Sequence, residues 1–191
     1  YRYYPVSLPA DDDRLALAGR KLGWGDLDEC EVANVSCPVH ELEYYLPLSR
    51  DVREMNAFAG VLAEKNILGD AGTREKLFAA LEAEVPENMA QALEIAAGLE
   101  RYTILPEEVK TAEDYAVYYV KSEQMDMDID PDLQMFIDYK AYGEFRMKRD
   151  GVVQTGHGLV LREDIPLAQL TEELEECRLF SPLSGFLYAY D

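Results

Sequence analysis

The residues best suited to catalysis or metal binding are few and scattered. The chain has two histidines, His40 and His157, which lie far apart in the sequence, and neither is accompanied by a nucleophile motif. His157 lies in a Gly-His-Gly segment, where we expect a turn or bulge with a structural histidine. Cys30, Cys37 and Cys177 lack zinc-type spacing, which favours reduced thiols in the cytoplasm. The sequence therefore predicts no enzyme, no metal and no cofactor.

A denser candidate is the acidic run at residues 123–132, with the sequence EQMDMDIDPD. Aspartates at alternate positions could bind calcium, but the run lacks the turn glycine and the terminal glutamate of a calcium loop. If the run is extended, its aspartates share one side, and Met127 and Ile129 take the other. A solvated face and a charged binding surface both remain open, and we favour the binding surface.

The charge of the whole chain is unusual. Its 191 residues include 38 acids and 18 bases, a net charge of −20, and 48% hydrophobic residues, which favour a folded protein. Self-repulsion at such a charge destabilises a compact state, so the charge needs an explanation. Solubility or adaptation to salt is one possibility. The sequence has no basic patch of the kind that binds nucleic acid directly. It also has no apolar run long enough to span a membrane.

The carboxylates also recur at helical spacing. Acids three or four positions apart on a helix have Cβ atoms about 5–6 Å apart, close to the separation of successive phosphates on a DNA strand. Twenty net charges match ~34 Å of duplex, about ten base pairs. Such a surface would compete for proteins that hold phosphates with Lys and Arg. The helical acids are Glu82, Glu84, Glu87, Glu94, Glu100, Glu172, Glu173, Glu175 and Glu176.

Local patterns predict an α+β fold made of an elongated row of small units. We expect an α+β unit at 1–48, a helical unit at 49–101, a second α+β unit at 102–162, and a helix and strand at 163–191. Helices are expected at 11–23, after caps at Ser49 and Thr73, after Pro86, at 111–123 and from Asp130 to 143. Strands are expected at 1–8, 29–36, 43–46, 102–105, 145–148 and 152–161, with Asp150-Gly151 as a hairpin turn.

Residues 111–161 carry a resemblance to a known family. The segments AEDYAVYYV, DLQMFIDYKAYGEF and GVVQTGHGLVL occur in the same order as similar segments in ArdA-type antirestriction proteins. The earlier helix REMNAFAGVLAE is similar to an ELNRLA-like helix of that family. The resemblance covers about residues 1–162 and is more specific in the last third. The family's opening strand is shortened here, Gly156 stands where asparagine is common, and residues 163–191 have no counterpart.

The resemblance implies a function and a partner. Family members are elongated dimers that imitate bent B-form DNA and occupy the DNA groove of type I restriction-modification enzymes. We therefore expect a non-enzymatic, homodimeric antirestriction protein. The alternative is an acidic interaction or scaffold protein that does not mimic DNA. The expected acidic surface comprises Glu113, Asp114, Glu123, Asp126, Asp128, Asp130, Asp132, Asp138 and Glu144, and the expected dimer contact comprises Tyr139, Ala141 and Tyr142.

Overall fold

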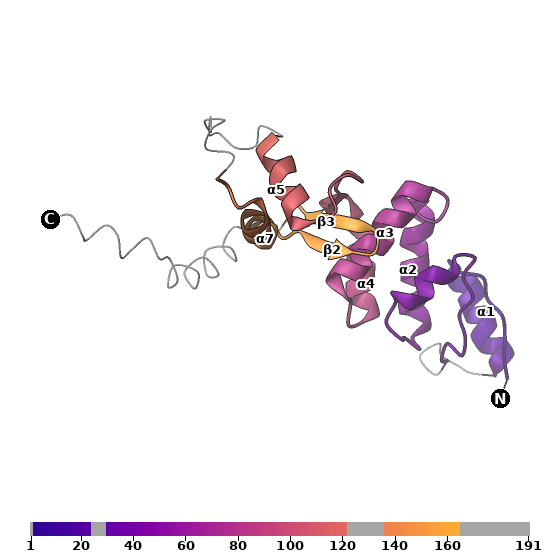
Figure 1. Ribbon diagram of the computed structural model, residues 1–191. Coiled ribbons are helices and arrows are strands. Elements are labelled where there is room, and N and C mark those ends of the chain that lie inside the picture. Colours follow the sequence, from indigo (N-terminus) through magenta and orange to yellow (C-terminus); the bar gives the residue numbers. More distant parts are fainter. Residues whose placement is uncertain (1, 24–29, 122–135, 165–191) are drawn as a thin grey trace. The chain divides into compact units, whose positions relative to one another are not determined.

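The computed structural model combines α-helices with one small sheet, which confirms the α+β class (Figure 1). The chain forms two compact units. The first contains residues up to 110 together with 153–161, and the second contains 111–152 and the residues from 162. The structure describes residues 2–23, 30–121 and 136–164.

The first helix of the first unit, α1 (Asp12–Leu22), is confirmed where the sequence predicts it. Asp11 caps its amino end by accepting a hydrogen bond from the backbone N–H of Arg14 at 2.8 Å. Gly23 ends it in the left-handed conformation, with φ of 87°, a geometry that favours glycine. The buried face of the helix carries Leu15 and Ala18, as the apolar spacing predicts.

The predicted strands near the amino end are wrong. Within the described residues, 2–8 are irregular, and segment 29–36 contributes only one isolated bridge, between Glu31 and Asp51. Residues 43–46 overlap a 3₁₀ helix, η2 (His40–Tyr44), whose Leu42 is buried. Apolar and β-branched content predicts strands only where a neighbouring chain segment supplies a ladder, and within the described ranges no segment pairs with these residues beyond that one bridge.

Three helices form the centre of the first unit: α2 (Val52–Glu64), α3 (Ala71–Glu84) and α4 (Met89–Ala97). Their existence is predicted correctly, but the predicted caps are wrong. Asp51 and Asp70 are the caps of α2 and α3. Ser49 supports Asp51 through a hydrogen bond to its backbone N–H, and the Thr73 hydroxyl donates to Asp70. An aspartate preceding the helix thus takes the capping position.

The first unit is completed by a short 3₁₀ helix, η3 (Leu99–Arg101), and a sheet in the order β1-β3-β2. Strand β1 is Tyr102–Ile104, β2 is Val153–Thr155 and β3 is Gly158–Arg162. β2 and β3 are antiparallel and pair Val153 with Val160, so the segment 152–161, expected as a strand, is two strands joined at Gly156-His157, where a turn or bulge was expected. The core joins the helices to this sheet through Phe58, Leu77, Phe78, Leu81, Met89, Ile95, Tyr102 and Val160.

The second unit contains α5 (Ala112–Lys121) and α7 (Tyr139–Asp150). The predicted capping box at the start of α5 is confirmed, because the backbone N–H of Thr111 donates to Asp114 and that of Asp114 donates to the Thr111 hydroxyl. The predicted strand 145–148 is wrong, since it lies inside α7. Gly151, with φ of 69°, ends this helix instead of turning a hairpin. An Asp-Gly pair suits both a helix end and a hairpin turn, because each needs a residue in the left-handed conformation.

The start of α7 also differs from the prediction. The helix was expected from Asp130, but 130–135 lie outside the described residues and 136–138 are not helical. Asp138 is the amino-terminal cap and accepts a hydrogen bond from the backbone N–H of Ala141 at 3.0 Å. The helix at this cap therefore begins at Tyr139, and residues 136–138, which the apolar pattern places in the helix, precede it.

Candidate functional site

The first unit carries a large excess of exposed carboxylates. Residues 30–110 contain fifteen acids and seven bases, a net charge of −8. Fourteen of the fifteen acidic side chains are exposed. They lie on the outer faces of α2, α3 and α4 and on the segments that precede and follow these helices, because the apolar faces pack into the core. The charge is thus presented to solvent.

Only part of this charge is neutralised locally. Ion pairs join Arg50 to Glu31 at 3.2 Å and Lys65 to Glu100 at 3.1 Å, and both are largely exposed. Such pairs contribute little to stability. Several other exposed carboxylates have no base within ion-pair distance among residues 2–23, 30–121 and 136–164. These are Glu41, Glu64, Glu75, Glu87, Glu94 and Glu108.

Glu82 differs from the other helical acids. The sequence places it among the exposed carboxylates, but its side chain is half-buried. Both carboxylate oxygens accept a hydrogen bond from the backbone N–H of Gly156, each at 3.0 Å. Glu82 therefore holds the β2–β3 turn against α3 and is not part of the free acidic surface. Periodicity could not reveal this, because the donor lies 74 positions away.

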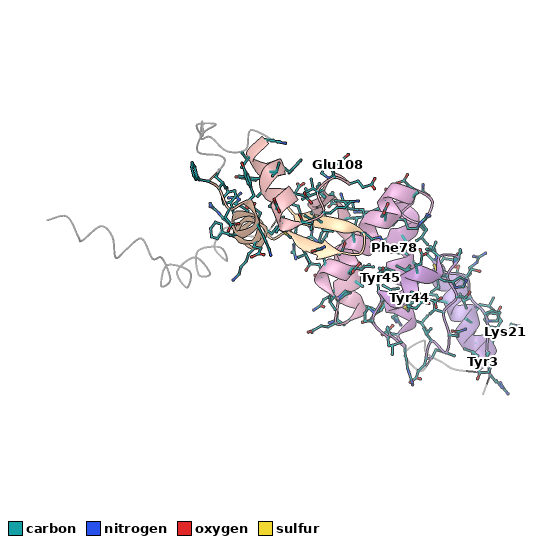
Figure 2. All side chains as sticks on the ribbon, viewed as in Figure 1. Tyr3, Lys21, Tyr44, Tyr45, Phe78 and Glu108 are labelled. Atoms are coloured by element: carbon teal, nitrogen blue, oxygen red, sulfur yellow. The ribbon has the colours of Figure 1, made fainter. Side chains whose placement is uncertain are left out.

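The same turn places His157 in an aromatic cluster. Its Nε2 lies 3.0 Å from the hydroxyl of Tyr45, and its ring lies 5.8 Å from that of Phe78. Tyr45 in turn stacks on Phe78 at 5.3 Å, and Figure 2 shows the two side by side. Burial raises the pKa of Tyr45, and the charges of Glu82 and Glu41 raise it further. The three rings pack against one another, so we interpret the cluster as a contact that stabilises the fold.

The predicted acidic surface is divided by the structure. Glu123, Asp126, Asp128, Asp130 and Asp132 lie outside the described residues. Glu113, Asp138 and Glu144 are exposed, although Asp138 also caps α7, and Asp114 is half-buried in the capping box of α5. Counted over the described residues, the second unit has seven acids and six bases. The exposed negative charge of the described chain is thus concentrated at 30–110, a region that the predicted set did not include.

The predicted dimer residues lie in the first turn of α7. Ala141 is exposed, and Tyr139 and Tyr142 are half-buried. Two aromatic side chains near them, Phe136 and Phe145, are 79% and 40% exposed. Sequence reasoning missed Phe145 as a surface residue because it placed this position in a strand. Ala141 and Phe145 are four residues apart, so they share one face of α7.

The opposite side of α7 is fixed to α5 by a polar cluster. Arg146 is buried, donates to Asp150 at 2.8 Å and stacks over the ring of Tyr119 at 3.8 Å. The hydroxyl of Tyr115 also donates to Asp150, at 2.8 Å. Burial, together with this hydrogen bond and the charge of Asp150, raises the pKa of Tyr115 well above its ordinary value. The pairing orients α7 so that Ala141 is left exposed.

The described residues contain neither a metal-binding cluster nor a membrane-spanning helix. Among the described residues, no three His, Cys, Asp or Glu side chains form a group that could hold a metal ion. None of the helices in the described ranges is both long and apolar enough to cross a membrane.

In comparisons with known proteins, no family model matches the chain and no curated protein matches its sequence.

Proposed function

We propose that this protein is an antirestriction protein that inhibits type I restriction-modification enzymes in the cytoplasm by imitating the charge of DNA. The observation that supports the proposal best is the exposure of fourteen of the fifteen carboxylates in residues 30–110, with a net charge of −8. A polyanionic surface competes for a groove in which Lys and Arg hold phosphates. The choice of enzyme rests on the resemblance of residues 111–161 to ArdA-type proteins.

Mimicry also explains why the charge is left uncompensated. On α4, Glu87 precedes the helix and Glu94 lies within it. On α2 and α3, the outer faces carry Glu64 and Glu75. A chain selected only for stability gains from Lys or Arg at neighbouring helical positions, about 0.2–0.5 kcal/mol per pair. An inhibitor of a DNA-binding protein gains from their absence, because each carboxylate then remains available to a cation of the partner.

The direct test is competition. A purified type I restriction-modification enzyme is bound to labelled duplex DNA, and the protein is added at increasing concentration and at several salt concentrations. We expect displacement of the DNA and an affinity that falls steeply with salt, because screening weakens contacts between exposed charges. A complex that forms beside bound DNA, or an affinity that barely changes between low and physiological salt, would contradict mimicry.

The alternative, an acidic interaction protein without mimicry, is favoured by one observation. Tyr44 and Leu48 are 85% and 106% exposed, so the first unit also presents apolar side chains to solvent. A scaffold that docks through such side chains alone should bind its partner with little dependence on salt and without displacing DNA. The competition experiment therefore distinguishes the two functions.

A further inference from the structure

The segment 40–48 holds one aromatic side chain outward on a fixed backbone. Leu42 is buried in the core, and Tyr45 stacks on Phe78 and contacts His157. Tyr44 lies between these two inward-facing anchors and is 85% exposed (Figure 2). Its backbone is therefore held in place on both sides, although the side chain itself lies in solvent.

Such an arrangement suits binding because the backbone around Tyr44 is already ordered in the free protein. A tyrosine side chain has only two rotatable bonds before its hydroxyl, so little conformational entropy is lost when a partner covers it. Tyrosine is also among the residues that contribute most to the energy of protein interfaces. Leu48, fully exposed, follows four residues later and lies within about 14 Å of Tyr44, well inside a single interface.

The surroundings of Tyr44 are acidic. Glu41 and Glu43 precede it on η2, and both are exposed. The sequence has no lysine or arginine from residue 22 to residue 49, so the nearest bases along the chain are Lys21 and Arg50. His40 lies 3.9 Å from Glu43. An apolar side chain beside two exposed carboxylates is complementary to an apolar pocket that carries cations at its rim.

We propose that Tyr44 and Leu48 are the anchor residues of a docking surface for a protein that presents an apolar pocket rimmed by Lys and Arg. The inference rests on the proposed function, because this partner is the enzyme that the acidic surface attracts. The carboxylates bring the partner to the surface, and the two apolar side chains hold it there. Charge thus sets the rate of association and Tyr44 the rate of dissociation.

The first test compares Tyr44→Ala with Tyr3→Ala, a matched change at a tyrosine that is 76% exposed and remote in sequence. Binding of each variant to a purified type I restriction-modification enzyme is followed kinetically. We expect Tyr44→Ala to dissociate about 10–30-fold faster with an unchanged salt dependence, and Tyr3→Ala to match the parent. Because Tyr44 lies in solvent, both variants should keep the circular dichroism and melting temperature of the parent.

A second test needs no restriction enzyme. A displayed library of short peptides is selected against the full chain, and the selected peptides are then assayed on the parent, Tyr44→Ala, Leu48→Ser and Tyr3→Ala. The inference predicts peptides that combine Lys or Arg with an apolar residue and that bind Tyr44→Ala at least tenfold more weakly than Tyr3→Ala. Peptides that do not distinguish these two variants, or a selection that yields none, would overturn it.

The two tests separate the proposals. If the enzyme does not bind the parent, the antirestriction function fails, and the peptide selection alone decides whether Tyr44 and Leu48 form a docking surface. If the enzyme binds the parent and Tyr44→Ala equally well, the docking surface is refuted while the charge-based function stands.

Discussion

Glu82 and Gly156 are joined by a forked contact, in which both carboxylate oxygens accept from one backbone N–H at 3.0 Å. The contact fixes the turn between β2 and β3 on the side of α3. Because the turn also carries His157 into its cluster with Tyr45 and Phe78, one glutamate supports the placement of a whole aromatic group.

Replacing Glu82 by alanine should destabilise the protein by about 1 kcal/mol, since a partly exposed hydrogen bond is lost and the helix itself is unaffected. Urea unfolding followed by circular dichroism measures the change. Glu75→Ala on the same helix is the matched control, because Glu75 is exposed and makes no ion pair within the described residues. Equal stability of the two variants would show that the contact with Gly156 contributes nothing.

Gly143→Ala should damage the second unit. A methyl group at this position would overlap the backbone carbonyl of Ala112, so α5 and α7 would have to separate. We expect a loss of roughly 1–3 kcal/mol or more, measured by thermal unfolding. Gly60→Ala in α2 is the control, since no atom lies within 4 Å of the added methyl group. It should be neutral or stabilising by up to about 1 kcal/mol.

Stability should fall in alkaline solution because of Tyr115. Burial and Asp150 hold the pKa of its phenol above the ordinary value of 10.0 in the folded protein. Below pH 10 both states keep the proton and the stability from this group is constant. Above pH 10 the unfolded chain ionises first, so the free energy of unfolding decreases as pH rises. Tyr115→Phe should show a shallower decrease in urea unfolding at alkaline pH, although it is less stable at neutral pH. Identical slopes would contradict the assignment.

The homodimer that the family resemblance implies can be tested at Ala141. This residue is exposed on α7, so Ala141→Asp should leave the fold and the melting temperature unchanged. If α7 forms the dimer contact, the buried charge should convert a dimer at micromolar concentration into a monomer in sedimentation equilibrium. Tyr142→Ala should do the same, but Tyr142 is half-buried and its loss also affects packing. A parent protein that sediments only as a monomer, at low and high salt alike, would refute the dimer.

The acidic surface should act through many small contributions. Glu64→Gln, Glu75→Gln or Glu94→Gln alone should weaken binding to the restriction enzyme by less than about fivefold, because each exposed charge pair contributes about 1 kcal/mol or less. The triple variant should be weaker by roughly the product of these factors and should show a shallower dependence on salt. A single one of these changes that abolished inhibition in a folded protein would indicate a local site instead of a charged surface.

The helices were predictable because their signals are local. In α1 the spacing of Leu15 and Ala18, the capping Asp11 and the terminal Gly23 all lie within one segment. Strands depend on distant partners, and this explains both the wrong strands near the amino end and the correct β1, whose neighbour β3 comes from a separate run of apolar residues. Phe145 to Lys148 alternates like a strand, yet the contact of Gly143 with Ala112 and the ion pair of Arg146 with Asp150 fix it as a helix.

The candidate site was predictable in kind but not in place. Composition alone indicates an acidic surface, since 38 acids cannot all be buried. Which carboxylates remain free depends on contacts across the chain. Glu82 is half-buried against Gly156 and Asp114 is half-buried in the capping box of α5, whereas Asp138 caps α7 and stays exposed. The outward position of Tyr44 follows from the stacking of its neighbour Tyr45 on Phe78, a contact that no local pattern encodes.

The order of the sheet also governs how the protein can fold while it is being made. β1 ends at Ile104, but its neighbour β3 begins only at Gly158, after the whole of 111–152 has been translated. At about 5–20 residues per second, the ribosome needs roughly 3–10 s to cover this interval. During that time β1, including Tyr102, has not yet paired with β3. The helices α5 and α7 can pair before it does. The β2–β3 hairpin, made after α5 and α7, therefore closes the unit whose helices were made first.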